Sequence, residues 1–244
     1  KVKIEARAQE RFAREQAEFD ARMVKRAARE KATGKRPGGK PPQPPAAGPR
    51  ADDQINLTDE ASRILKVAGG GFEQCYNAQA VVDTESLLIL APHVTQAPND
   101  KEQIAPLVAK VQANPEGLNR PATWLADTGY YSEKNVATCV AAGIEPLIAV
   151  KREEHHPGWR ERFTDPEPLA GDASPVEVMK HKLKTRAGRA AYALRKQTVE
   201  PVFGIIKSVM GFRQFLLRGL EHVRSEWTLV CLAWNLKRMA VLRP

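Results

Sequence analysis

The chain has 244 residues, a net charge of +9 and 42% hydrophobic residues, values typical of a folded protein and not of a disordered one. No stretch approaches the roughly eighteen apolar residues of a membrane span, and the start lacks the apolar segment of a signal peptide. The three cysteines lie far apart, which excludes a disulfide framework and a paired-cysteine metal site. We therefore expect a cytoplasmic protein, and the first residue, a lysine, suggests a piece of a longer chain.

The charge is distributed unevenly along the chain. Residues 1–50 hold 14 Lys and Arg against 6 Asp and Glu, residues 51–150 hold 6 against 13, and residues 151–244 hold 18 against 10. Basic segments attract a polyanion, most often nucleic acid, and an acidic segment between them suits bound Mg²⁺. Scattered solvated charge is the alternative explanation.

The composition divides the chain into three parts. Residues 1–32 are rich in Ala, Glu, Arg and Lys without Pro or Gly, which predicts an exposed basic helix that docks on a partner or stands free. Residues 33–54 contain six prolines and four glycines, which predicts a linker that is either a solvated tether or in contact with DNA phosphates through its basic KRPGGK stretch. Residues 55–244 form the predicted folded domain.

Hydrophobic patterning in the domain predicts strands first and then alternating helices and strands. The predicted strands are 54–58, 72–83, 86–95, 123–127 and 145–150, the predicted helices are 101–114, 133–143 and 186–242, and 151–185 is a predicted loop or insertion. Asn99-Asp100 and Ser132 are the predicted caps of the first two helices. Three antiparallel strands followed by this alternation indicate an α/β fold, a ribonuclease H-like mixed sheet with an antiparallel flank and flanking helices.

Three acidic residues fall where such a sheet carries chemistry. Asp59 ends the first predicted strand, Asp127 ends the fourth, and Glu200 lies in a late helical stretch. Three converging carboxylates suit two Mg²⁺ ions roughly 3.5–4 Å apart, which activate water and stabilise the leaving oxygen of a phosphodiester. An Asp that follows a buried strand is also a common turn residue, so each position has a purely structural explanation as well.

The late helical stretch carries a more specific pattern. Tyr192, Lys196, Glu200 and Lys207 share one face of a helix over 192–207. A carboxylate among cations on one face can hold a metal while the cations hold phosphate, although charge pairing on a solvated helix gives the same spacing. Pro201 predicts a kink or a helix restart at Glu200.

Near the C-terminus, apolar residues recur at helical spacing, which predicts that they pack in the core. They are Trp227, Leu229, Val230, Leu232, Ala233, Leu236 and Met239.

Taken together, these residues resemble the catalytic part of bacterial insertion-sequence DDE transposases of the Tyr-Arg-Glu-Lys signature group. The resemblance covers about residues 54–150 and 186–242, and the combination of D-x-G-Y-[FY]-S with Y…E-P-x-F-G-x-x-K is specific. The stretches that carry it are NLTDEASRILK (56–66), FEQCYNAQAVVD (72–83), HVTQAPND (93–100), ADTGYYSEKN (126–135), YALRKQTVEPVFGIIK (192–207) and GFRQFLLRGLEHVRSEWTLVCLAWNLKRM (211–239).

The resemblance implies catalytic and metal-binding roles for three acids. Asp127 corresponds to the second catalytic Asp and Glu200 to the catalytic Glu. The first catalytic Asp corresponds to Asp59, with Asp83, at a hairpin turn, as the runner-up; Asp100 is read as a helix cap.

The resemblance also implies DNA and phosphate contacts for the signature residues. Tyr192 is the signature Tyr, and Lys207 follows Glu200 at the signature spacing. The signature Arg is displaced by one residue, so either Arg195 or Lys196 makes the phosphate contact.

The implied activity is transposition of DNA by an endonuclease and strand-transfer mechanism. Two Mg²⁺ ions, for which Mn²⁺ substitutes, serve cleavage at the ends of an insertion sequence, and the freed 3′-OH attacks target DNA. The implied partners are the terminal repeats, the target DNA and a second copy of the chain, with the nucleoid as location. One alternative is a catalytically inactive, transposase-derived DNA-binding protein, and another is an interaction protein built on the 1–32 helix.

Overall fold

The structure, a computed structural model, describes residues 1–67, 69–118, 120–150, 164–169 and 171–243. It divides into two compact units, Lys1–Glu60 and Ala61–Pro244. Among the described residues, no helix has both the length and the apolar character that crossing a membrane requires.

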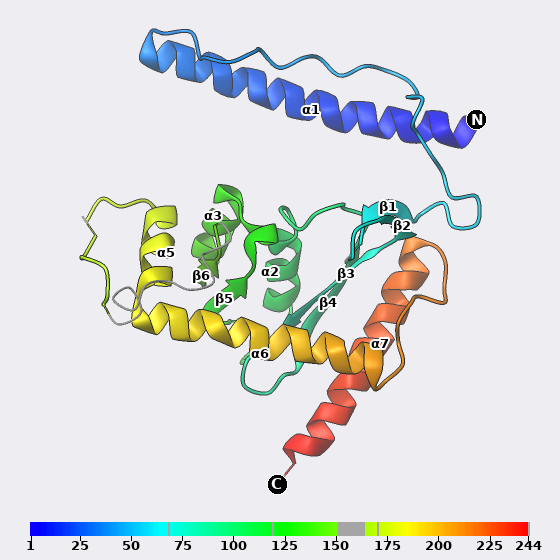
Figure 1. Ribbon diagram of the computed structural model, residues 1–244, viewed down its shortest axis with the longest axis vertical. Helices are drawn as coiled ribbons and strands as arrows, with labels where there is room; N and C mark the ends of the chain where they lie inside the picture. Colours follow the sequence, from blue (N-terminus) through cyan, green and yellow to red (C-terminus); the bar gives the residue numbers. More distant parts are fainter. Residues whose placement is uncertain (68, 119, 151–163, 170, 244) are drawn as a thin grey trace. The chain divides into compact units, whose positions relative to one another are not determined.

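The first unit is built on one long helix, α1 (Val2–Thr33), which confirms the helix predicted over 1–32 (Figure 1). The helix ends at Gly34, whose φ of 65° lies in the left-handed region that glycine adopts readily. After this turn the chain stays close to α1, since Arg26 donates a hydrogen bond of 2.6 Å to the carbonyl of Pro37.

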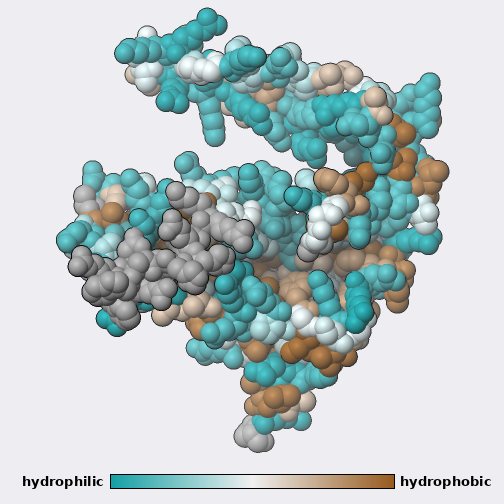
Figure 2. All heavy atoms as spheres, in the orientation of Figure 1, coloured by the Kyte–Doolittle hydropathy of each residue, from teal (hydrophilic) through white to brown (hydrophobic). Residues whose placement is uncertain are grey.

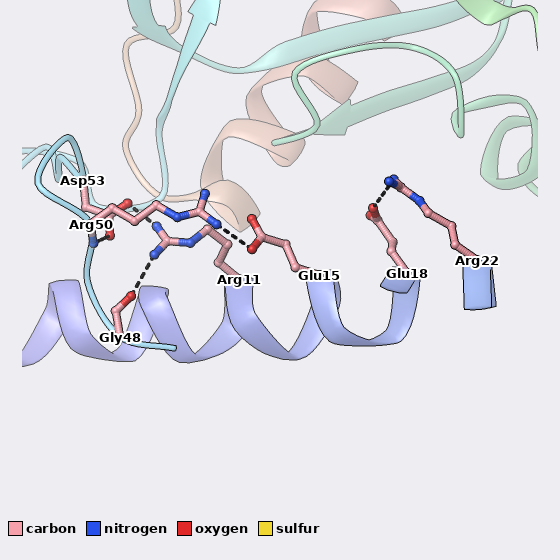
Figure 3. Close-up of polar contacts among 7 residues, drawn as sticks. All are labelled: Arg11, Glu15, Glu18, Arg22, Gly48, Arg50 and Asp53. Atoms are coloured by element: carbon pink, nitrogen blue, oxygen red, sulfur yellow. Dashed lines mark hydrogen bonds and ion pairs between the residues drawn. The ribbon is translucent and has the colours of Figure 1, made fainter. Parts of the chain in front are cut away.

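The proline-rich segment is held along α1 by charged side chains (Figure 3). Arg11 contacts the Asp53 carboxylate and donates to the carbonyl of Gly48 at 3.0 Å, while Arg50 lies 2.7 Å from Glu15. A hydrogen bond from the Arg50 backbone and the Arg11 guanidinium lower the pKa of Asp53. The segment predicted as a linker is largely exposed, and these side chains tie it to its own helix.

The second unit combines short strands with helices (Figure 1). Its described residues form three separate two-stranded sheets: β1 pairs antiparallel with β2, β3 antiparallel with β4, and β5 parallel with β6. The strands are β1 (Arg63–Lys66), β2 (Phe72–Cys75), β3 (Asn77–Val82), β4 (Ile89–Thr95), β5 (Thr123–Ala126) and β6 (Glu145–Ile148). The helices are α2 (Ile104–Gln112), the short 3₁₀ helix η1 (Thr128–Tyr130), α3 (Glu133–Ala141), α5 (Pro175–Lys184), α6 (Arg186–Ser208) and α7 (Leu220–Leu242).

The mixed α/β class and the predicted hairpin are confirmed, whereas two predicted segments are wrong. Residues 54–58 form no strand, and the first strand lies at 63–66 instead. Part of the predicted loop over 151–185 is helix α5, which begins at a capping box of Ser174 and Glu177. The segment 151–163 of that predicted loop lies outside the described residues.

The predicted caps had different outcomes. Ser132 caps α3 as predicted, because its Oγ accepts the N–H of Asn135 at 3.1 Å. Helix α2 begins only at Ile104, and its first flanking residue, Gln103, makes no side-chain cap. The prediction that Asn99-Asp100 caps this helix is therefore wrong, and the Asp100 carboxylate is used elsewhere.

Helix α6 passes across both hydrophobic clusters of the second unit's described residues. The first cluster gathers side chains of α2, β5, α3, β6 and α5, and Tyr192 packs against it. The second lies between the β3–β4 hairpin, α6 and α7, where Val202 and Ile206 are fully buried. Because its two halves pack on different clusters, α6 can present its middle to the end of β5.

Helix α7 closes the second cluster through two tryptophans. Trp227 donates from Nε1 to the carbonyl of Gln79 at 2.9 Å, and Trp234 donates to the carbonyl of Leu87 at 2.8 Å. The ring of Phe203 stacks on Trp227 with centroids 5.6 Å apart.

The prediction that all the apolar residues of α7 pack in the core is wrong. Trp227 is buried, but the side chains on the other side of the helix remain exposed, because none of the second unit's described residues covers them. Figure 2 shows hydrophobic side chains at the surface toward the C-terminal end of α7. The exposed residues are Leu229, Leu232, Leu236 and Met239.

Candidate active site

Asp127 lies at the point where β5 ends and the chain turns. One carboxylate oxygen, Oδ1, accepts the N–H of Gly129 at 2.9 Å, so Asp127 caps the short helix η1. The side chain is nevertheless 49% exposed, and its other oxygen, Oδ2, faces Arg195 of α6. Asp127 is therefore a turn residue that also presents a carboxylate oxygen for chemistry.

Arg195 brings the two predicted acids together. Its Nη1 lies 4.0 Å from Asp127 Oδ2, and its Nη2 lies 3.7 Å from Glu200 Oε1. The guanidinium also lies 5.8 Å from the centre of the Tyr192 ring. The Arg195 side chain is only 20% exposed, and its Nε is buried without a hydrogen-bond partner. Arg195 therefore links the end of β5 to helix α6.

Arg195 and Lys196 occupy different positions on α6. Arg195 is the cation beside the acids, whereas Lys196 and Lys207 are exposed on the helix surface. Of the two outcomes predicted at Pro201, the helix restart is wrong, because α6 continues as one helix from Arg186 to Ser208. Burial of residues before and after Pro201 stabilises this helix despite the missing N–H.

The structure adds a carboxylate that sequence reasoning missed. Asp100 Oδ1 accepts hydrogen bonds from Asn77 Nδ2 at 2.7 Å and from Gln79 Nε2 at 2.6 Å. A Cβ added to Gly129 would lie 3.0 Å from Asp127 Oδ1 and 3.4 Å from Asp100 Oδ2. Asp100 and Asp127 therefore border the same glycine, with Asp100 oriented by two amides.

A signal for Asp100 was present in the sequence. Asn77 and Gln79 alternate with alanines in β3, and the period of two places both amides on the same face of the strand. Gln79 is only 3% exposed, and a buried amide in an apolar strand calls for a polar partner.

Asn135 connects the loop after β4 to the turn after β5. Its side chain is 1% exposed, and Nδ2 donates to the carbonyls of Lys101 at 2.7 Å and Tyr130 at 2.6 Å. Since Lys101 follows Asp100 and Tyr130 belongs to η1, this one amide fixes both acidic segments. Burial, and then the charges of Asp100 and Asp127, raise the pKa of the Tyr130 hydroxyl.

The two candidates for the first acid both lie between regular elements. Asp59 belongs to the first unit, in a turn where Asn56 Oδ1 accepts its N–H at 3.3 Å, and not at the end of a strand. Asp83 lies in the turn of the β3–β4 hairpin, the opposite end of β3 from Asn77. Its Oδ2 accepts from both the N–H and the hydroxyl of Ser86. Burial raises the pKa of Asp83, but the hydrogen bonds from Ser86 and the turn backbone outweigh it and lower the pKa overall.

Carboxylate oxygens are the ligands that a hard divalent cation such as Mg²⁺ prefers, and Asp127 and Glu200 both offer exposed ones. In the structure Arg195, itself a cation, lies between the two acids. No group of three His, Cys, Asp or Glu side chains in the described part of the chain is positioned to hold a metal. The structure thus brings two carboxylates near one arginine and does not show a complete metal site among the described residues.

Comparison with known families gives one result. The sequence profile described as "Transposase DDE domain" matches residues 52–236, which is most of the chain. Comparisons with curated proteins and with solved structures give no match. The matched range contains both acids that converge on Arg195, and we conclude that the chain belongs to the DDE transposase family.

Proposed function

We propose that this protein cleaves DNA at the ends of an insertion sequence and transfers the freed strand to target DNA. The observation that carries the proposal is the convergence of Asp127 and Glu200 on Arg195, in a chain of the DDE family. The two acids come from different elements, a strand end and a helix, so their proximity arises from the fold and not from local sequence. We further propose that the β3–β4 hairpin and the β5–β6 pair, which are separate two-stranded sheets in the structure, correspond to parts of a ribonuclease H-like fold.

The acids serve a divalent metal. Two Mg²⁺ ions, for which Mn²⁺ substitutes, supply activation of water and stabilisation of the leaving oxygen when bound. Asp127 and Glu200 are the proposed ligands, with Asp59 as the third and Asp83 as its runner-up. Asp100 is a further candidate, because its Oδ2 lies beside Gly129 next to Asp127.

The cations and the tyrosine of α6 position the DNA backbone. Arg195 is preorganised by its contacts with both acids and Tyr192, so a phosphate that enters the site meets a guanidinium already in place. Lys196 and Lys207 add exposed positive charge on the same helix. Such contacts fix the register of a strand without reading its sequence. We propose the terminal repeats and target DNA as the bound nucleic acid, with two copies of the protein acting together in the nucleoid.

A calorimetric titration with Mn²⁺ in the presence of a short DNA duplex, paired with a cleavage assay, tests the proposal. Asp127→Ala and Glu200→Ala should each abolish cleavage and weaken Mn²⁺ binding at least tenfold. Glu133→Ala, an exposed acid in the first turn of α3, is the control that should change neither.

The same titration identifies the third ligand. Loss of Mn²⁺ binding in Asp59→Ala, Asp83→Ala or Asp100→Ala selects that residue over the other two. Salt-sensitive DNA binding by the parent without cleavage or Mn²⁺ binding would contradict the proposal and favour a DNA-binding protein without turnover.

A further inference from the structure

Arg195 lies between the two carboxylates that the candidate site offers for chemistry. Its Nη1 lies 4.0 Å from Asp127 Oδ2, and its Nη2 lies 3.7 Å from Glu200 Oε1. The other oxygen of Asp127, Oδ1, already accepts the N–H of Gly129 at 2.9 Å. The oxygen of Asp127 that is left to bind a cation is therefore the one nearest the guanidinium.

The two acids do not fit a divalent cation in this arrangement. A guanidinium keeps its positive charge throughout the physiological pH range, so it repels a second cation at the same carboxylates. Within the described part of the chain, no third His, Cys, Asp or Glu completes a metal-binding group with the two acids. Arg195 and a divalent metal therefore compete for Asp127 and Glu200.

Hydrogen bonds do not fix Arg195 in its place between the acids. Both distances exceed the roughly 3.2 Å limit of an ordinary N–H···O hydrogen bond, so charge attraction and the nearby ring of Tyr192 hold the guanidinium. Its Nε is buried and has no hydrogen-bond partner among the described residues. An arginine with unused donors suits a phosphate, which accepts two parallel N–H bonds. A DNA phosphate can therefore draw the guanidinium away from the acids.

We infer that Arg195 blocks metal binding in the DNA-free protein and releases Asp127 and Glu200 when a DNA phosphate binds its guanidinium. Since this order belongs to the proposed catalytic site, it rests on the proposed function. It makes DNA the first ligand of the site and a divalent metal the second. The two binding free energies are coupled through one side chain, so each ligand raises the affinity for the other by the same factor.

Prevention of metal binding is tested by a Mn²⁺ titration of the DNA-free protein, in which electron paramagnetic resonance measures the free ion. Arg195→Gln should lower the dissociation constant for Mn²⁺ by about tenfold, because the repulsion between the guanidinium and the ion is lost. Arg195→Lys keeps the charge and should stay close to the parent. Lys134→Gln removes an exposed cation of α3 and is the matched control, for which water screening limits the change to less than about twofold.

Release by DNA is tested by the same titration with a saturating short duplex, with the duplex alone as the blank. DNA should tighten Mn²⁺ binding by the parent, and the gain should be about tenfold smaller for Arg195→Gln, in which no guanidinium remains to be displaced. Fluorescence anisotropy without metal gives the duplex concentration that saturates each protein.

Three results would overturn the inference. They are an Arg195→Gln variant that binds Mn²⁺ no tighter than the DNA-free parent, a Lys134→Gln variant that gains as much affinity, and an equal gain from DNA in the parent and Arg195→Gln. Any of them in a parent that cleaves DNA would leave the proposed function standing. A gain confined to Arg195→Gln, together with a parent that cleaves no DNA, would instead contradict the proposed function alone.

Discussion

Arg195, in the middle of α6, lies 4.0 Å from the carboxylate of Asp127, which directly follows β5. This ion pair joins the helix that carries Glu200 to the end of the strand that precedes Asp127. The same guanidinium lies near Glu200, so one side chain contacts both acids. Arg195 precedes by one residue the position at which the resemblance expects the arginine, yet it still lies near both acids.

Substitutions of Arg195 and of its neighbour Lys196 should affect DNA cleavage to different extents. We expect Arg195→Ala to lower DNA cleavage by roughly 10- to 100-fold, the range for losing hydrogen bonds to a charged group. Lys196→Ala, which removes an exposed charge, should lower cleavage less than about threefold. Single-turnover cleavage of a short duplex measures both. Equal effects of the two substitutions would contradict the assignment of the signature Arg to Arg195.

The substitution Gly129→Ala, which adds a single methyl group beside Asp127, should lower DNA cleavage. In Gly129→Ala the new Cβ would lie 3.0 Å from Asp127 Oδ1, so this carboxylate must shift, and 3.4 Å from Asp100 Oδ2, an ordinary contact. We expect cleavage to fall at least tenfold, while the free energy of unfolding changes by less than about 1 kcal/mol because the residue is exposed.

Gly204→Ala is the matched control for this substitution. Gly204 lies in α6 with no atom within 4 Å of the added Cβ, so the change should stabilise the protein by about 0.5–1 kcal/mol without loss of cleavage. Urea unfolding and the cleavage assay check both variants. Unchanged cleavage in Gly129→Ala would show that the Asp127 carboxylate tolerates displacement.

The sequence predicted correctly those features that depend on residues close together in the chain. Ser132 begins α3 as predicted because its cap hydrogen bond lies within four residues of chain. The β3–β4 hairpin is confirmed for the same reason, since Asp83 and Ser86 make the turn by themselves. Asp127 and Glu200 were predicted from sequence motifs, because secondary-structure propensities alone do not distinguish them from other acidic residues.

Predictions that depended on tertiary context were wrong. The exposure of Leu232 cannot be read from helical spacing, because an apolar stripe that stays exposed has the same period as one that faces the core. Pro201 leaves α6 unbroken since packing on both sides outweighs a local preference. Asp100 was taken for a helix cap because its real partners, Asn77 and Gln79, lie more than twenty residues earlier in the chain.

Asn135 should carry a large share of the local stability around the site. In Asn135→Ala the buried carbonyls of Lys101 and Tyr130 lose their donor, which should cost about 1–3 kcal/mol of unfolding free energy. Asn135→Asp has the same size but lacks the donors, so it should lose at least as much. Thr138→Ala, on the partly exposed side of α3, should stay within about 0.5 kcal/mol of the parent. Urea unfolding measures all three, and a stable Asn135→Ala would contradict the role of this amide.

Tyr130 should make the free energy of unfolding fall as the pH rises in the alkaline range. Its pKa is raised in the folded protein by burial and by the negative charges of Asp100 and Asp127, so the folded state holds the phenolic proton more tightly than the unfolded state does. The stabilising contribution is therefore complete below the unfolded pKa of about 10 and is lost as the pH rises above it, by at most about 1.4 kcal/mol per pH unit.

Tyr130→Phe removes this proton, so its unfolding free energy should fall less steeply than that of the parent between pH 10 and about 12. Burial raises the pKa of the Cys139 thiol to about 11, which adds a slope in the same range, but that slope is common to both proteins and cancels in their difference. Urea unfolding at stepped pH measures the difference. Parallel curves for the two proteins would show that the hydroxyl titrates alike in the folded and unfolded states, and that the two carboxylates do not act on it.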